Sequence, residues 1–232
     1  MKIVVIHGQN HHGSTWNVAR ILIENIAGEK EVREYLLPGD LNHFCLGCFR
    51  CLEARECCPY SKDKEPISRD MQEADLLIFT SPNYCMMPSA PMKAFLDLFF
   101  TNWISHKPYG EMFRKRAVVI STTAGMGAGK TTKLIATNLK NWGIPEITRY
   151  GIAVNAMNWD MVPERKKQKI DRAMRKLGQR LSRGRRVRIG LTARIRFWFF
   201  GGMQKADMGA SEIEKQYWLD NGWLSGQKPW KQ

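Results

Sequence analysis

The sequence predicts an α/β fold, in which a doubly wound parallel sheet of five strands carries helices on both faces. Short apolar runs alternate with segments of helical periodicity along the first 181 residues. The apolar runs are continuous, which is typical of strands that crossover helices bury on both faces. A chain of 232 residues, 44% of them hydrophobic, can form one such core and still leave a further segment.

The first half of the chain contains three predicted strands, over 2–6, 31–37 and 75–80. A loop and a helix over 14–26 follow the first strand, and the apolar residues of this helix lie three or four apart. The second strand ends at Pro38 and Gly39. A cysteine-rich loop and a short helix over 68–74 come next.

The second half continues the alternation, with strands over 116–122 and 147–154 and helices over 91–100, 130–142 and 163–181. No internal repeat or low-complexity linker interrupts the pattern. Residues 1–181 are therefore predicted to form one domain, and residues 182–232 a basic, aromatic C-terminal extension. In such a sheet, ligands bind at the carboxyl ends of the strands.

The net charge of +14 belongs mainly to one segment. Between Glu164 and Lys205, 15 Lys and Arg residues accompany two acidic residues, whereas the other residues carry 21 basic and 20 acidic groups. The predicted ligand-binding body is thus nearly neutral.

The sequence also predicts a soluble, cytoplasmic protein. The amino terminus lacks the basic region and cleavage site of a signal peptide, and the apolar run 197–200 is far shorter than a membrane span. Five of the six cysteines lie within 45–58, a clustering more typical of metal sites than of disulfide frameworks. We therefore expect reduced thiols.

The loop after the first strand has the composition of a phosphate site. Its sequence is Gly8-Gln9-Asn10-His11-His12-Gly13-Ser14-Thr15. The helix that follows presents unpaired backbone N–H groups and the positive end of its dipole. Ser14 and Thr15 can donate hydroxyls to a phosphate, while Gly8 and Gly13 allow close approach of the backbone. A plain helix cap without a ligand is the alternative.

The loop after the third strand suits a flat aromatic ring. Its sequence is Ser81-Pro82-Asn83-Tyr84-Cys85-Met86-Met87-Pro88-Ser89. Tyr84, Met86 and Met87 offer soft, polarizable surface. A Pro- and Ser-rich turn with buried methionines is the alternative. Cys85 is interpreted as a packing residue, because no His or Asp is identifiable as its activator.

These two loops resemble those of the NAD(P)H-dependent FMN reductases, a branch of the flavodoxin-like proteins. Residues 81–97 match the pattern S-P-x-Y-x-x-x-x-S-x-x-x-K-x-F-x-D of that family. The resemblance implies that the FMN phosphate is bound by Gln9, His11, Ser14 and Thr15. It implies that the flavin ring is bound by Pro82, Asn83, Tyr84, Cys85, Met86 and Met87, with its far edge at Thr123, Ala124 and Gly125. Gln9 and His11 stand where the family has Ser and Arg.

A competing motif lies in mid-chain. Residues Ala124 to Thr131 follow an apolar strand and open a helix, and so meet a relaxed P-loop pattern. Ala124 stands where the strict pattern has Gly, and no later apolar strand ends in an Asp placed to hold magnesium. A P-loop nucleotide-binding protein is therefore the first alternative to a flavoprotein.

The cysteine spacing predicts a metal centre, with ligands Cys45, Cys48, Cys51 and Cys57. Three thiolates in one compact loop and a fourth nearby suit a 4Fe-4S cluster better than a tetrahedral zinc ion. The spacing resembles that of the iron-sulfur flavoproteins, relatives of the FMN reductases. Cys58, which precedes a proline as in bacterial ferredoxin motifs, is the alternative fourth ligand. Free thiols that pack under the flavin loop are the alternative to a cluster.

The extension combines Arg194 and Arg196 with the aromatic run 197–200. Three uses fit this composition: self-packing or a homo-oligomer contact, an anionic membrane surface, and nucleic acid. No nucleic-acid-binding motif accompanies the charge, which disfavours the third use.

The sequence thus predicts an FMN-dependent oxidoreductase that takes electrons from NAD(P)H or a ferredoxin-like donor. The cofactor carries the chemistry, so no catalytic side chain is predicted. The electron acceptor is not identifiable from the sequence. A non-enzymatic electron carrier is the second alternative.

Overall fold

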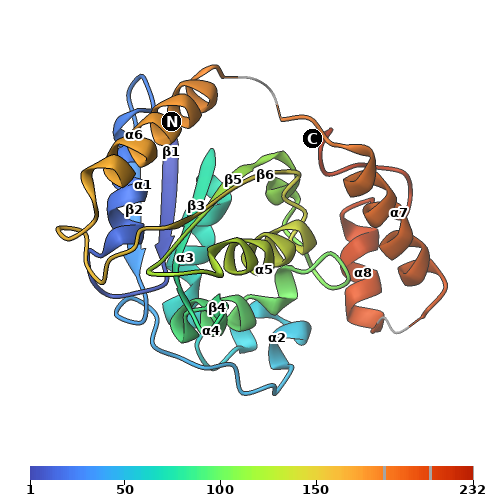
Figure 1. Cartoon of the computed structure of the whole chain (residues 1–232). Helices are drawn as coiled ribbons and strands as arrows, with labels where there is room; N and C mark the ends of the chain where they lie inside the picture. The colour runs from blue at the N-terminus through green and yellow to red at the C-terminus, as the bar shows by residue number, and fades with distance from the viewer. Residues whose placement is uncertain (185–186, 209–210, 232) are drawn as a thin grey trace.

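The computed structural model of the chain describes residues 1–184, 187–208 and 211–231. Its centre is a parallel sheet in the order β2-β1-β3-β5-β6 (Figure 1). The five strands are β1 (Lys2–His7), β2 (Glu31–Leu36), β3 (Leu76–Tyr84), β5 (Arg116–Thr123) and β6 (Glu146–Ala153). A short strand, β4 (Met87–Pro88), pairs antiparallel with the end of β3. The order of the five main strands is that of flavodoxin-like folds, which confirms the predicted fold class.

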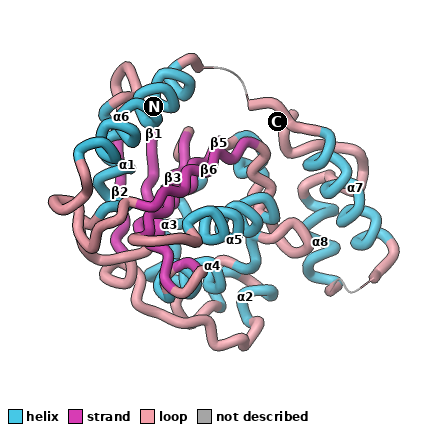
Figure 2. Tube along the Cα trace, in the orientation of Figure 1, coloured by secondary structure: helices cyan, strands magenta, loops and turns pink. Residues whose placement is uncertain are grey.

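Helices cover both faces of the sheet (Figure 2). One face is covered by α1 (Ser14–Glu24) and α6 (Glu164–Ser182), and the other by α3 (Ser61–Glu73), α4 (Ala90–Leu98) and α5 (Ala128–Asn141). Side chains of β3 alternate between the two cores: Leu76 and Ile78 face α1 and α6, while Leu77 and Phe79 face the other helices. Burial on both faces explains the continuous apolar strands.

The helix predicted over 68–74 is longer than expected and begins at Ser61. Pro66, which precedes the predicted start, occupies the second turn of this helix. A proline there removes one backbone hydrogen bond. Burial of Ile67 and Met71 against the sheet offsets this loss, so the prediction of the helix start was wrong.

The residues after α6 form two further helices, α7 (Leu191–Lys205) and α8 (Glu212–Asp220), which pack against each other and against the body. The shared aromatic cluster consists of Ile104, Phe113, Phe197, Trp218, Trp223 and Leu224. Trp218 donates its indole N–H to the carbonyl of His106 (2.9 Å). The predicted helical extension is confirmed. Helix α6 ends at Ser182, one residue past the predicted domain boundary at 181. That boundary stays a prediction.

Candidate functional site

The two loops singled out from the sequence meet at the carboxyl edge of the sheet. The N–H of Gly8 donates to the carbonyl of Thr80 (2.7 Å). Ser89 is the N-cap residue of α4, and its hydroxyl donates to the carbonyl of Gly8 (2.5 Å). A Cβ on Gly8 would lie 2.7 Å from the Ser89 Oγ and 3.0 Å from the Thr80 carbonyl. Only glycine fits where β1 leaves the sheet.

The first turn of α1 has the features of an anion site. Its N-cap residue, Gly13, has no capping side chain, and the turn contains no acidic residue. The Thr15 Oγ1 is buried and has no hydrogen-bond partner among the described residues. A Cβ on Gly13 would lie 2.5 Å from Gln9 Nε2 and 3.0 Å from His11 Nε2, so both side chains reach this helix end. Free N–H groups, a spare hydroxyl and the helix dipole suit a phosphate.

Strands β3 and β4 form a tight hairpin beside this candidate site. β3 runs four residues past its predicted end, because residues 81–82 pair with β5 and residues 83–84 pair with β4. The turn consists of Cys85 and Met86, at φ 50° and 65°. Two successive non-glycine residues in the left-handed region are costly, and such strain is found most often at functional sites. Tyr84 and Met87 flank the turn, with 56% and 49% of their surface exposed.

Asn83 ties this hairpin to the glycine-rich loop after β5. Its Nδ2 donates to the carbonyl of Met126 (2.9 Å), and its Oδ1 accepts from the hydroxyl of Thr131 (2.6 Å). Gly127 has φ 101°, and a Cβ on it would collide with the Met86 Sδ. The three loops are thus one connected surface. Because the Thr131 hydroxyl is hydrogen-bonded to Asn83, it is not free to bind magnesium as a P-loop Thr does.

A buried His–Glu pair lies at the carboxyl end of β1. The ring of His7 is 1% exposed and lies 3.0 Å from Thr80 Oγ1 and 2.7 Å from Glu34 Oε2. The indole of Trp16 donates to the same carboxylate oxygen (3.2 Å). The hydrogen bond with His7 holds the pKa of Glu34 below its usual range, although burial opposes it. This pair links β2 to the strand that leads to the first turn of α1.

The predicted cofactor residues therefore lie at the carboxyl ends of β1, β3 and β5 and in the segments that directly follow these strands. Their individual roles stay predictions. Three residues that connect the loops were not among them, namely Ser89, Gly127 and Thr131. Ser89 precedes Ala-Pro at a helix start, which is a capping signal in the sequence. No local pattern indicates the bond between Thr131 and Asn83, because 48 residues separate them.

The cysteine loop, in contrast, is not arranged around a common centre. Cys45 and Cys48 are exposed, Cys51 is buried and Cys57 is partly exposed. Over the described ranges, no group of three or more His, Cys, Asp or Glu side chains could hold a metal ion. The side chains as arranged do not fit an iron-sulfur cluster. The cluster and its four ligands stay predictions.

Cys58, not Cys57, is the cysteine that contacts a buried lysine here. The Lys64 Nζ donates to the Cys58 Sγ at 3.7 Å. Burial raises the pKa of the Cys51 thiol, while the charge of Lys64 opposes the rise and the charge of Cys58 adds to it. Cys51, Cys58 and Lys64 therefore form one buried group.

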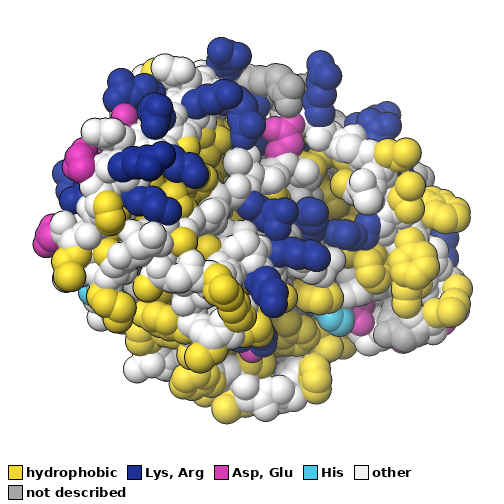
Figure 3. Space-filling model, in the orientation of Figure 1, with side chains coloured by type: hydrophobic (Ala, Val, Ile, Leu, Met, Phe, Trp, Pro, Cys, Tyr) yellow, Lys and Arg dark blue, Asp and Glu magenta, His cyan; other side chains and the backbone are white. Residues whose placement is uncertain are grey.

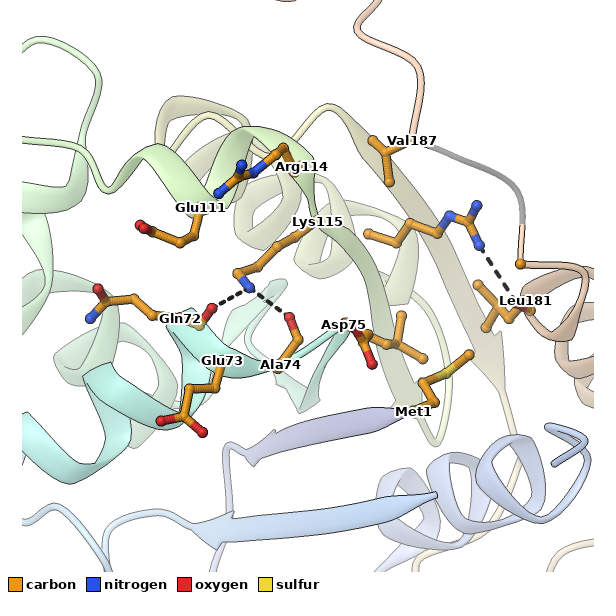
Figure 4. A pocket seen from close by; sticks show the side chains of 13 residues that line it. Met1, Gln72, Glu73, Ala74, Asp75, Glu111, Arg114, Lys115, Leu181 and Val187 are labelled. Carbon is orange, nitrogen blue, oxygen red and sulfur yellow. Dashed lines mark hydrogen bonds between the residues drawn. The ribbon is translucent and has the colours of Figure 1, made fainter. Parts of the chain in front are cut away.

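A cavity of about 470 Å³ lies at the opposite, amino edge of the sheet (Figure 4). Lys115 projects into it and donates to the carbonyls of Gln72 and Ala74, both at 2.6 Å. Burial lowers the pKa of Lys115 to about 8. These bonds cap the end of α3, so Lys115 has a structural role, and ligands of such sheets bind at the other edge.

Two curated relatives each match part of the chain. An iron-sulfur flavoprotein of Archaeoglobus fulgidus is 30% identical over 122 residues, which cover 49% of this chain and 50% of that protein. An iron-sulfur flavoprotein of Methanocaldococcus jannaschii is 35% identical over 100 residues, which cover 42% of this chain and 51% of that protein. The chain thus spans about half the length of these curated relatives.

Solved structures share the fold at low sequence identity. An FMN-dependent NADH-azoreductase from Bacillus anthracis, solved in complex with FMN, has a TM-score of 0.57 at 13% identity and covers 78% of this chain and 100% of its own. The apo form of an NADH:FMN oxidoreductase, EMOB, has a TM-score of 0.53 at 19% identity, with 78% and 90% coverage. The NADPH-dependent FMN reductase family matches residues 1–156, a range that contains the sheet and all three loops. The chain therefore belongs to the NADPH-dependent FMN reductase family.

Proposed function

We propose that this protein binds FMN at the carboxyl edge of its sheet and uses it to oxidise NAD(P)H. The observation that carries the proposal is the buried hydroxyl of Thr15 at the uncapped end of α1, which has no hydrogen-bond partner within residues 1–184, 187–208 and 211–231. A dianionic phosphate supplies the acceptor that this hydroxyl and the free N–H groups lack. When bound, FMN supplies the capacity to take a hydride from a nicotinamide and pass the electrons on.

The protein's own residues bind and orient the cofactor in this proposal. Gln9, His11, Ser14 and Thr15 hold the phosphate. The hairpin over 82–87 lies against the flavin ring, and Thr123, Ala124 and Gly125 lie at its far edge. Support comes from the bonds of Asn83, which fix the hairpin and the glycine-rich loop relative to each other. A ferredoxin-like donor, a homo-oligomer and a cytoplasmic location stay predictions, as does an iron-sulfur cluster.

Thr15→Val tests the proposed phosphate site with an isosteric change. We expect the Kd for FMN to rise about tenfold, because a hydrogen bond to a charged group is lost. The free energy of unfolding should change little, since no described residue pairs with this hydroxyl. Thr132→Val is the matched control, because Thr132 is equally buried and its hydroxyl donates to the Gly129 carbonyl (3.0 Å). Calorimetric titration with FMN measures both variants, and equal affinity for Thr15→Val and wild type would contradict the assignment.

Anaerobic reduction of the FMN-loaded protein tests the reaction. We expect NADH or NADPH to bleach the flavin absorbance within seconds, and an added acceptor such as a quinone to restore it. Bleaching by a reduced ferredoxin but by neither nicotinamide would support the electron carrier instead. Thermal stabilisation by ATP and magnesium, lost in Lys130→Ala, would support the P-loop alternative.

A further inference from the structure

Helix α7 exposes an apolar face to solvent. Four of its residues, spaced three, four or one apart, have more than half of their surface exposed: Leu191 (73%), Ile195 (54%), Trp198 (76%) and Phe199 (55%). At this spacing they share one side of the helix, in an arc of roughly 100°. Figure 3 shows hydrophobic side chains gathered over α7 at the right edge of the molecule. We call these four residues the α7 stripe.

The opposite side of α7 packs against the body, and the α7 stripe therefore faces solvent. Phe197 is 2% exposed and stacks on Trp218 with ring centroids 5.0 Å apart. Gln204 is also 2% exposed and donates its Nε2 to the carbonyl of Ser105 (2.9 Å). These contacts allow little rotation of the helix about its axis.

Cations flank the α7 stripe on both sides. By their helical positions, Arg194 and Lys205 lie along one border of the stripe and Arg196 along the other. These three are the Lys and Arg residues of α7, which contains no Asp or Glu. Long basic side chains beside an apolar stripe are typical of helices that lie in the plane of an anionic membrane surface.

We propose that α7 docks this protein on an anionic lipid surface. The α7 stripe enters the boundary between headgroups and acyl chains, and the flanking cations contact lipid phosphates. None of the helices in the described ranges is long and apolar enough to cross a membrane, so the helix lies on the surface. The positive charge of α7 is attracted to an anionic bilayer. A bilayer of neutral lipid alone offers no such attraction.

A second copy of the chain suits the α7 stripe less well. A two-fold contact through α7 would place Arg194, Arg196 and Lys205 of one copy beside the same cations of the other. The nearest acidic residue after the helix, Asp207, already pairs with Lys215 (2.7 Å). Such a contact would bring like charges together without a compensating carboxylate.

Vesicle flotation with the full chain tests the proposal without any measurement of flavin chemistry. We expect the protein to float with vesicles of equal parts phosphatidylglycerol and phosphatidylcholine at low salt, and not with pure phosphatidylcholine. The double variant Trp198→Ser/Phe199→Ser should lower the partition coefficient by about tenfold or more, because the apolar anchor is lost. Leu134→Ser, at an exposed leucine of α5, is the matched control and should bind like wild type.

Circular dichroism shows whether each variant keeps its fold. Absence of binding at low salt would overturn the proposal, as would equal binding of the double variant and wild type. A stable dimer that the double variant dissociates, with no vesicle binding, would assign the α7 stripe to a second copy. Binding to single-stranded nucleic acid in preference to anionic vesicles would also overturn it.

Discussion

Replacing Ser14 with Asp should raise the Kd for FMN by about 100-fold while the protein stays folded. A carboxylate at the first residue of α1 would compete for the N–H groups that a phosphate needs and would repel that phosphate. The same carboxylate interacts favourably with the helix dipole, and the first turn of α1 contains no acidic residue now. The free energy of unfolding should therefore rise by about 0.3–1 kcal/mol.

In Ser14→Asp, weaker FMN binding together with a higher free energy of unfolding would distinguish a phosphate site from a plain helix start. Calorimetric titration with FMN and urea denaturation measure the two quantities. Ser14→Asn is the control, because it has nearly the same size without the charge and should weaken FMN binding by less than about tenfold. Wild-type affinity in Ser14→Asp would show that no phosphate binds at this helix.

The second large effect is expected at Trp218 in the C-terminal extension. Its side chain is fully buried, stacks on Phe197, contacts Trp223 with ring centroids 5.2 Å apart and donates to the carbonyl of His106. Trp218→Ala should lower the free energy of unfolding by about 3–5 kcal/mol, because a large cavity opens and a hydrogen bond is lost.

Urea denaturation checks this prediction, with Trp198→Ala as its control. Trp198 is 76% exposed, so its truncation should change the free energy of unfolding by less than about 0.5 kcal/mol. A small effect of Trp218→Ala, together with a separate early transition, would show that residues 182–232 unfold apart from the body. One cooperative transition would show that the extension is part of the folding unit.

The sheet, and the position of the predicted cofactor residues at its carboxyl edge, were predictable because their signals are local. Runs of apolar, β-branched residues indicate strands that both faces bury. The loop over 8–15 indicates an anion site because a helix start without an acid follows a buried strand. The hairpin turn at Cys85 and Met86 was harder to predict from the sequence, since neither residue is the Gly or Asn that normally indicates positive φ.

Adjacent residues of α7 show a second limit of sequence patterns. Phe197 is buried and Trp198 is exposed, yet both are large and aromatic. The helix has apolar residues on opposite sides, so hydrophobic periodicity alone does not indicate which side is buried. Only the position of Trp218, 21 residues later, decides which side of α7 packs against the body. The cysteine spacing shows the same limit, because it does not determine whether the thiol groups point toward a common centre.

Comparison of FMN with riboflavin in calorimetric titrations of the wild-type protein tests the central claim most directly. The two ligands share the ring system and differ in the phosphate. If the N-terminus of α1 binds the phosphate, the Kd for FMN is at least about 100-fold lower than that for riboflavin. The ratio of the two Kd values should then be smaller in Ser14→Asp. Equal affinities for the two ligands, or no binding of either, would contradict the account.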